Sequence, residues 1–250
     1  MRRLHPDPID LDDDGALDAA MRAPRRHDDG RPWVFGNMVS SLDGAISVDG
    51  VSGGLGGEGD RRLFDAIRAQ ADVVLVGAAT VRVEEYGAPG DDEALVARRT
   101  ANGVANVMRV AIVTRSLDLD LDGELFARPT SRPLVITVAS SDDDRRARVA
   151  ARADVIVAGD DHVDLRRALD ELRARGLTRV LSEGGPRLNG QLFEDDLLDE
   201  LNLTLSPHLA GGDGPTMVST PTAGLRPFTR HHVLSHGDEL FLRYLRDRVT

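Results

Sequence analysis

The amino-acid sequence predicts an α/β fold with a mainly parallel central sheet, helices on both of its faces and an antiparallel hairpin at the C-terminus. Two observations lead to this prediction. Between residues 72 and 182, short runs that are apolar throughout alternate with amphipathic segments, which is typical of parallel strands covered on both faces. Beyond residue 200, apolar and polar residues alternate one by one, as in antiparallel strands with one buried face.

The expected elements follow from hydrophobic period and turn residues. Strands are expected at residues 33–39, 45–48, 72–77, 109–114, 133–138, 154–158, 179–182, 200–206, 229–235 and 239–245. Helices are expected around residues 16–22, from residue 60, and at 78–85, 143–152, 164–175 and beyond 185, with a polar loop up to Gly103. The turn His236-Gly237-Asp238 would close the hairpin. Since no repeat or linker interrupts the chain, we expect an N-terminal extension, residues 1–31, and a single domain, residues 32–250.

Composition excludes several classes of function. A net charge of −11 opposes binding to nucleic-acid phosphates. The chain has no cysteine, which excludes disulfides and thiolate chemistry, and all 31 basic residues are arginines, which excludes a lysine Schiff base and the lysine of a Walker loop. No stretch approaches the roughly 18 apolar residues of a membrane span. Residues 1–31 also lack an apolar run of signal-peptide length, so we expect a cytoplasmic protein.

Two patterns are tempting and are discounted. Gly54-Leu-Gly56-Gly-Glu-Gly59 satisfies G-x-G-x-x-G, but it follows a turn and not a buried strand, so a mobile loop over a site is expected instead of a dinucleotide fingerprint. His231, His232 and His236 suggest a metal site. In a strand, however, His231 would point away from the other two, which would lie about 13 Å apart. Surface or edge-strand histidines and no metal are expected, and the acidic runs 12–14 and 142–144 are assigned to solvated loops and helix starts.

The segment from Arg179 to Asn189 carries the clearest functional signal. It predicts a buried strand, then the pair Gly184-Gly185, then an amphipathic helix. Glycines at such a turn let a ligand approach the backbone, and the free N–H groups of the helix start favour an anion. A phosphate-bearing cofactor fits this position, and a tight turn without a ligand is the alternative.

Four segments together suggest a nucleotide reductase. They are Asn37-Met-Val-Ser-Ser-Leu-Asp43-Gly44, Val76-Gly-Ala-Ala-Thr-Val-Arg82, Val113-Thr-Arg-Ser116 and Ser182-Glu-Gly-Gly185. The last three end predicted strands, at the edge of the sheet where ligands bind in open α/β folds. With the segment Leu198 to Gly211, this set resembles the pyrimidine reductase family of riboflavin biosynthesis. The resemblance covers residues 33–246 and implies a fold like that of dihydrofolate reductase.

The resemblance implies NADPH as the cofactor, with its diphosphate on the helix start described above. The residues then expected to contact it are Val39, Thr80, Thr114, Arg115, Ser116, Gly184, Gly185, Pro186, Arg187, Leu188 and Asn189. Arg115 would pair with the 2′-phosphate and favour NADPH over NADH. Alternatively, it is an exposed arginine that follows a strand.

The resemblance also implies the substrate, a ribosylamino-pyrimidine phosphate of the 5-amino-6-(5-phosphoribosylamino)uracil type, which is reduced to its ribitylamino form. Its expected ligands are Asn37, Ser52, Arg68 and Glu183. Arg68 would bind the phosphate, Glu183 would accept hydrogen bonds from the ring, and Glu84 would donate the proton. The alternatives are a solvated arginine, an acid at a helix start and an exposed Glu84–Glu85 pair.

Two positions depart from the family pattern, since family members often carry lysine at position 37 and aspartate at position 84. Both lie toward the substrate. Reduction of a pterin such as dihydrofolate, or a non-catalytic NADPH-binding role, are therefore alternatives. The absence of cysteine excludes the zinc deaminase domain that some relatives carry. A homodimer is expected, with a small-molecule substrate and with neither nucleic acid nor membrane as a partner.

Overall fold

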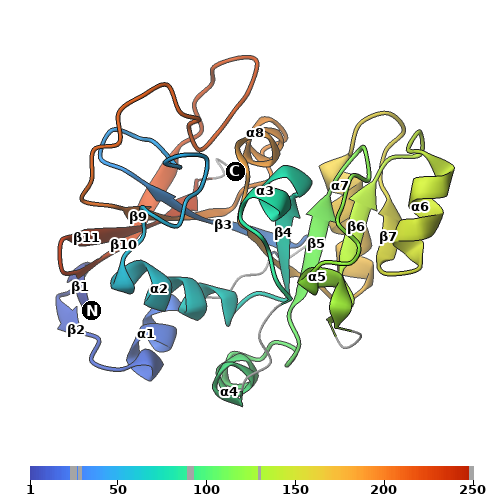
Figure 1. Ribbon diagram of the computed structural model, residues 1–250. Coiled ribbons are helices and arrows are strands. Elements are labelled where there is room, and N and C mark those ends of the chain that lie inside the picture. The colour runs from blue at the N-terminus through green and yellow to red at the C-terminus, as the bar shows by residue number, and fades with distance from the viewer. Residues whose placement is uncertain (23–26, 28–29, 89–92, 129–130, 248–250) are drawn as a thin grey trace.

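The computed structural model describes residues 1–22, 27, 30–88, 93–128 and 131–247. Within these ranges, eleven strands form one sheet in the order β2-β1-β10-β11-β9-β3-β8-β4-β5-β6-β7 (Figure 1). Neighbouring strands from β9 to β7 are parallel, whereas β11, β10, β1 and β2 pair antiparallel. The predicted fold class, a mainly parallel sheet with a C-terminal antiparallel hairpin, is confirmed.

Most elements lie within a few residues of their predicted bounds. The strands are β1 (Arg2–His5), β2 (Ile9–Asp10), β3 (Trp33–Ser40), β4 (Val73–Gly77), β5 (Arg109–Val113), β6 (Leu134–Thr137), β7 (Asp154–Val157), β8 (Arg179–Ser182), β9 (Glu200–Leu205), β10 (Phe228–His236) and β11 (Glu239–Arg246). The helices are α1 (Asp14–Met21), α2 (Glu58–Arg68), α3 (Ala78–Val83), α4 (Glu93–Ala101), α5 (Glu124–Ala127), α6 (Asp143–Ala150), α7 (Leu165–Ala174) and α8 (Pro186–Glu194).

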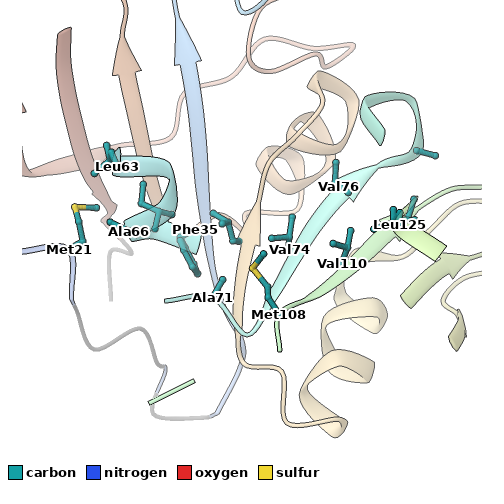
Figure 2. Packing of buried hydrophobic residues seen from close by; sticks show 14 of the residues in the cluster. Met21, Phe35, Leu63, Ala66, Ala71, Val74, Val76, Met108, Val110 and Leu125 are labelled. Atoms are coloured by element: carbon teal, nitrogen blue, oxygen red, sulfur yellow. The ribbon is translucent and has the colours of Figure 1, made fainter. Parts of the chain in front are cut away.

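Apolar residues on both faces of the sheet explain why its parallel strands read as continuous apolar runs. Side chains of β4 point alternately to opposite faces. Val74 and Val76 belong to a buried cluster with Leu63 and Ala66 of α2, as Figure 2 shows. Leu75 packs in a second cluster on the other face, which includes residues of α7 and α8. Helices therefore cover both faces, and none in the described part of the chain has the length and apolar character needed to cross a bilayer.

Several local expectations were wrong. Residues 45–48 do not form a strand, because only Val48 makes an isolated bridge, to Val51. The polar stretch before Gly103 contains α4, and α5 was not predicted either. Strands β1 and β2 were also missed, since both are too short and too charged to show an apolar period. The two acidic runs do begin helices, because the side chains of Asp13 and Asp142 accept hydrogen bonds at the N-caps of α1 and α6.

The expectation that His231 and His232 point to opposite faces of a regular strand is wrong, because β10 contains a β-bulge. The register of β10 against β11 shifts between Arg230 and His232, so strict alternation of side chains fails there. The Nδ1 atoms of His231 and His232 lie 3.2 Å apart instead of on opposite faces. His232 is buried, against the expectation of a surface or edge residue, and burial lowers its pKa to about 3, aided by Arg243.

Candidate functional site

A cleft of about 600 Å³ lies at the carboxyl edge of the sheet. Its wall comes from the end of β3, one face of α2, the segment from α3 to Ala88, and the junction between β8 and α8. Figure 1 shows α3 and α8 side by side beyond the end of β4. This edge is where ligands bind in open α/β sheets. The cleft brings together the following residues of the predicted site: Asn37, Val39, Ser52, Arg68, Thr80, Glu84, Glu183, Gly184, Gly185, Pro186 and Asn189.

The glycine pair allows β8 to approach α3 very closely. The backbone N–H of Gly77 donates a hydrogen bond of 2.8 Å to the carbonyl oxygen of Gly184. Gly184 has a φ of +83°, and the peptide bond to Gly185 is cis. A Cβ atom on Gly185 would lie 2.7 Å from the Oγ1 atom of Thr80. The segments 76–82 and 182–185, which are distant in sequence, therefore meet here through backbone contacts. A side chain at position 185 would force them apart.

Helix α8 begins at this turn without a side-chain cap. Gly185 is its N-cap residue, and Pro186 occupies the first turn. The side-chain Nδ2 of Asn189 donates to the backbone carbonyl of Met217, and the side-chain Oδ1 of Asn189 accepts from the hydroxyl of Ser182. The second bond ties the first turn of α8 to the end of β8. Leu188 is buried in the core below and Arg187 is exposed, so neither lines the cleft. The backbone of the helix start is therefore the part that an anion can approach.

Thr114, Arg115 and Ser116 follow β5 at the same edge of the sheet, but they do not line the cleft. Thr114 is buried, and its hydroxyl accepts from the N–H of Leu117. The Ser116 carbonyl accepts a hydrogen bond of 3.1 Å from Arg145. Arg115 is exposed. This segment lies two strands away from β8, so only a ligand that extends beyond the cleft can reach it.

Arg68 and Glu183 form a tight pair in the wall of the same cleft, and Glu183 directly precedes the glycine pair. Nε and Nη2 of Arg68 donate to the two carboxylate oxygens over 2.7 and 2.6 Å. The Tyr86 hydroxyl donates to the same carboxylate over 2.5 Å. Burial lowers the pKa of Arg68, but the Glu183 charge outweighs it and the net pKa is raised. Burial, and then Glu183, raise the pKa of Tyr86, so its hydroxyl keeps its proton and donates it to the Glu183 carboxylate.

Glu84 and Ser52 also meet in the cleft wall. The Glu84 carboxylate accepts a hydrogen bond of 2.8 Å from the backbone N–H of Ser52, so a predicted catalytic residue and a predicted substrate ligand are neighbours. Asn37 lines the cleft from β3. The lining residues that sequence reasoning missed include Asp60, Phe64 and Tyr86. The first two share a helical face with Arg68 at a spacing of four, which is a signal that could have found them.

The G-x-G-x-x-G loop holds a carboxylate of the protein itself. The N–H groups of Gly57 and Gly59 donate to the two oxygens of Glu239 over 2.8 and 3.1 Å. This explains why the motif does not behave as a phosphate loop: β11 fills the position that a ligand would take. Within the described ranges, no group of three or more histidine, aspartate and glutamate side chains could hold a metal ion.

The Ser-Leu-Asp-Gly turn connects two of the motifs that carry the resemblance. Asp43 accepts hydrogen bonds from Ser41 and from the N–H groups of Ala210 and Gly211. These bonds, that of Ser41 first, lower the Asp43 pKa to about 2. The turn therefore anchors the segment around Gly211 and does not itself line the cleft.

A mainly parallel sheet with a glycine-lined cleft beyond its strand ends defines an α/β protein whose candidate ligand site lies at the carboxyl edge. The model of the RibD C-terminal domain family matches residues 32–234. The chain therefore belongs to the RibD C-terminal domain family, and its assignment to the riboflavin-pathway reductases is confirmed.

Individual relatives agree with this assignment. The 2,5-diamino-6-ribosylamino-4(3H)-pyrimidinone 5′-phosphate reductase of Methanothermobacter thermautotrophicus is 32% identical over 196 residues, covering 75% of this chain and 84% of that protein. The Archaeoglobus fulgidus protein of the same name is 30% identical over 190 residues, covering 75% and 86%. Among solved structures, a pyrimidine reductase-like protein from Corynebacterium diphtheriae has a TM-score of 0.78 and 26% identity over 87% of this chain and 93% of that one.

Proposed function

We propose that the protein reduces a ribosylamino-pyrimidine 5′-phosphate to its ribitylamino form with NADPH as the hydride donor. The observation that carries the proposal is a single cleft lined by two features, the junction of the glycine pair with the uncapped start of α8 and the Arg68–Glu183 pair. The first feature offers backbone N–H groups to a diphosphate. The second offers a fixed guanidinium, and two relatives are named for a reaction on such a pyrimidine.

The cofactor half of the proposal assigns the diphosphate to the backbone of Gly184, Gly185 and the first turn of α8. The space that a Cβ atom on Gly185 would fill supports this assignment, as does the absence of a side-chain cap. Thr80, next to Gly185, and Val39 line the same cleft. The segment Thr114–Ser116 would hold the adenosine end, which a dinucleotide reaches by extending along the strand ends.

The substrate half assigns the phosphate to Arg68, which Glu183 holds in place through both carboxylate oxygens. Asn37 and Ser52 would contact the remainder of the substrate. The nicotinamide supplies a hydride to C1′ of the ring-opened imine, and a proton must reach the imine nitrogen. Glu84 is proposed as that proton source, and its hydrogen bond from Ser52 fixes the carboxylate at the cleft wall.

Oxidation of NADPH by the purified protein tests the proposal. The protein is given the diamino-pyrimidinone ribosyl phosphate, its deaminated uracil analogue and dihydrofolate in parallel. Turnover of a pyrimidine phosphate supports the proposal. Turnover of dihydrofolate alone would make the chain a pterin reductase, and binding of NADPH without oxidation in any arm would make it a non-catalytic protein.

Arg68→Ala refines this test, because it should raise the KM for the pyrimidine phosphate at least tenfold while the KM for NADPH stays within about twofold. Arg62→Ala on the same helix is the matched control, since the ion pair of Arg62 among the described residues is with Asp14 at the surface. Equal increases in both KM values after Arg68→Ala would contradict the phosphate assignment. A thermal unfolding curve of each variant separates loss of binding from loss of fold.

We further propose that the protein is a cytoplasmic homodimer. Leu209 and Leu225, in the segment between β9 and β10, are 76% and 93% exposed. Exposed apolar side chains of this size are typical of association surfaces when they lie together. Sedimentation of the wild-type protein should give a dimer, and Leu225→Asp should weaken it. A monomeric wild-type protein would refute the proposal.

A further inference from the structure

Asp60 is a cleft residue to which the preceding assignment gives no role. It lies in the first turn of α2, and its side chain forms part of the cleft wall. Oδ1 accepts a hydrogen bond of 2.6 Å from the hydroxyl of Thr204, a buried residue of β9. Among the described residues, none donates a hydrogen bond to Oδ2. One carboxylate oxygen is therefore open to a ligand while the other fixes the side chain.

The glycine-rich loop determines where this carboxylate lies. A Cβ atom on Gly56 would come within 2.2 Å of Oδ2 of Asp60, so glycine at position 56 leaves the carboxylate its place. Burial raises the pKa of Asp60; the hydroxyl of Thr204 opposes this rise, Glu239 adds to it and Arg61 opposes it. These three groups come from β9, β11 and the helix itself, and burial leaves the Asp60 carboxylate with little access to bulk water. Such a group gains from a ligand that donates hydrogen bonds.

Helix α2 arranges three cleft residues in one row. Asp60, Phe64 and Arg68 follow one another at intervals of four residues, and all three line the cleft. Eight residues of α-helix separate Asp60 from Arg68 by about 12 Å. A pyrimidine that carries a ribose phosphate has a comparable length. With its phosphate at Arg68, its ring can therefore reach Asp60, with Phe64 between the two.

Glu183, the residue expected from the family to contact the ring, is already engaged. Both of its oxygens accept hydrogen bonds from Arg68, and one accepts a further bond from Tyr86. Its side chain is only 3% exposed. The carboxylate of Asp60, at the other end of the row from Arg68, has an open oxygen and is better suited to form hydrogen bonds with the ring.

We propose that Asp60, held by Thr204, recognises the 2-amino and N3–H groups of a 2-amino-4-oxopyrimidine ring and so selects the diamino-pyrimidinone over its deaminated uracil analogue. This inference rests on the proposed function. The diamino ring presents two adjacent donors, of which one can bond to the open Oδ2 and the other to the second lone pair of Oδ1, beside the bond from Thr204. The uracil ring replaces the 2-amino group with a carbonyl oxygen, which would face the open carboxylate oxygen without a proton between them.

An asparagine at position 60 has the opposite preference. Its amide presents one acceptor and one donor, which match the N3–H and 2-carbonyl groups of uracil. Asp60→Asn changes no volume, so the cleft keeps its shape. One substitution should therefore reverse a preference instead of merely weakening binding.

The experiment measures kcat/KM and, by calorimetry, Kd for both pyrimidines with wild type, Asp60→Asn, Gly56→Ala and Glu58→Gln. Glu58 is exposed in the same turn of α2, so its variant controls for loss of one negative charge. We expect wild type and Glu58→Gln to favour the diamino compound by about 10- to 100-fold, the discrimination typical of a bidentate pair. Asp60→Asn should lower this ratio at least tenfold. Gly56→Ala should lower it too, because the carboxylate must rotate away.

The outcomes separate the two proposals. An unchanged ratio in Asp60→Asn, in turnover and in Kd, would overturn the role of Asp60 and leave the proposed function intact. Absence of turnover with any pyrimidine would overturn the proposed function, while the Kd ratio would still test Asp60. Pterins carry the same 2-amino-4-oxo edge, so dihydrofolate is a further arm. If it is the better substrate and Asp60→Asn impairs it, the edge recognition stands and the riboflavin-pathway substrate fails.

Discussion

Helices α2 and α8 begin in the same way but have different partners. Each has a glycine as its N-cap residue, Gly57 and Gly185, and neither has a side-chain cap. At α2 the free N–H groups are bound by the Glu239 carboxylate of β11. At α8 the corresponding groups border the cleft. Local sequence therefore leaves free N–H groups at both helix starts, and tertiary structure decides which of them a carboxylate of the protein binds.

Gly185→Ala should have the largest effect on NADPH affinity, because the new methyl group would block access to the start of α8. The new methyl group would lie 2.7 Å from Oγ1 of Thr80, against the path to the helix start. We expect the Kd for NADPH to rise by about 100-fold or more. Calorimetry with NADPH measures it. The double variant with Thr80→Ala relieves the contact and should recover part of the affinity; no recovery would locate the effect elsewhere.

Glu239→Ala should affect stability instead of cofactor binding, because it empties the site that the protein fills itself. Loss of two charge-assisted hydrogen bonds to Gly57 and Gly59 should lower the free energy of unfolding by about 2 kcal/mol. Urea unfolding measures this change. The Kd for NADPH should stay within about twofold. A large loss of NADPH affinity would show that the loop before α2 belongs to the cofactor site after all.

Acidification should erase the substrate preference that we assign to Asp60. Its pKa is raised, first by burial and further by Glu239, so the carboxyl takes up a proton at a higher pH than an ordinary aspartate. A protonated carboxyl presents one donor and one acceptor, as asparagine does. The ratio of kcat/KM for the two pyrimidines should therefore fall by about tenfold as pH decreases through this pKa.

The same pKa predicts the sign of a stability effect. A raised pKa means that the folded state disfavours the charge, so the contribution of Asp60 to stability is present at low pH and lost as pH rises through the raised value. Asp60→Asn should therefore be more stable than wild type at neutral pH. Its pyrimidine preference should show no pH dependence from this group, and a persistent dependence would point to another residue.

Arg115→Ala should have the smallest effect. Arg115 is exposed at the end of β5, outside the cleft, so a charged partner there is well hydrated. We expect the preference for NADPH over NADH to fall about three- to tenfold, with kcat unchanged. Steady-state rates with both cofactors measure the ratio. An unchanged ratio would move recognition of the 2′-phosphate to another residue, such as the neighbouring Arg145.

The comparison of the two helix starts also shows what the sequence could reveal. The strand, turn and helix around Gly184 were predictable, because each depends on neighbours in the chain. The pairing of Gly57 with Glu239 was not, since these residues are 182 positions apart. The same holds for Arg68 with Glu183 and for Asp60 with Thr204. Side-chain partners across the fold carry no local signal, whereas backbone turns do.

The N-terminal strands have a consequence for how the molecule meets its neighbours. β1 pairs with β10 and is followed outward by β2, a strand of two residues with exposed ends. Short, charged outer strands discourage one sheet from adding to another. Removal of residues 1–10 would bare the hydrogen-bonding groups of Val233, Leu234 and Ser235, where β1 pairs with β10, and invite intermolecular strand addition there. The first residues thus protect this edge of the sheet against the addition of a strand from another molecule.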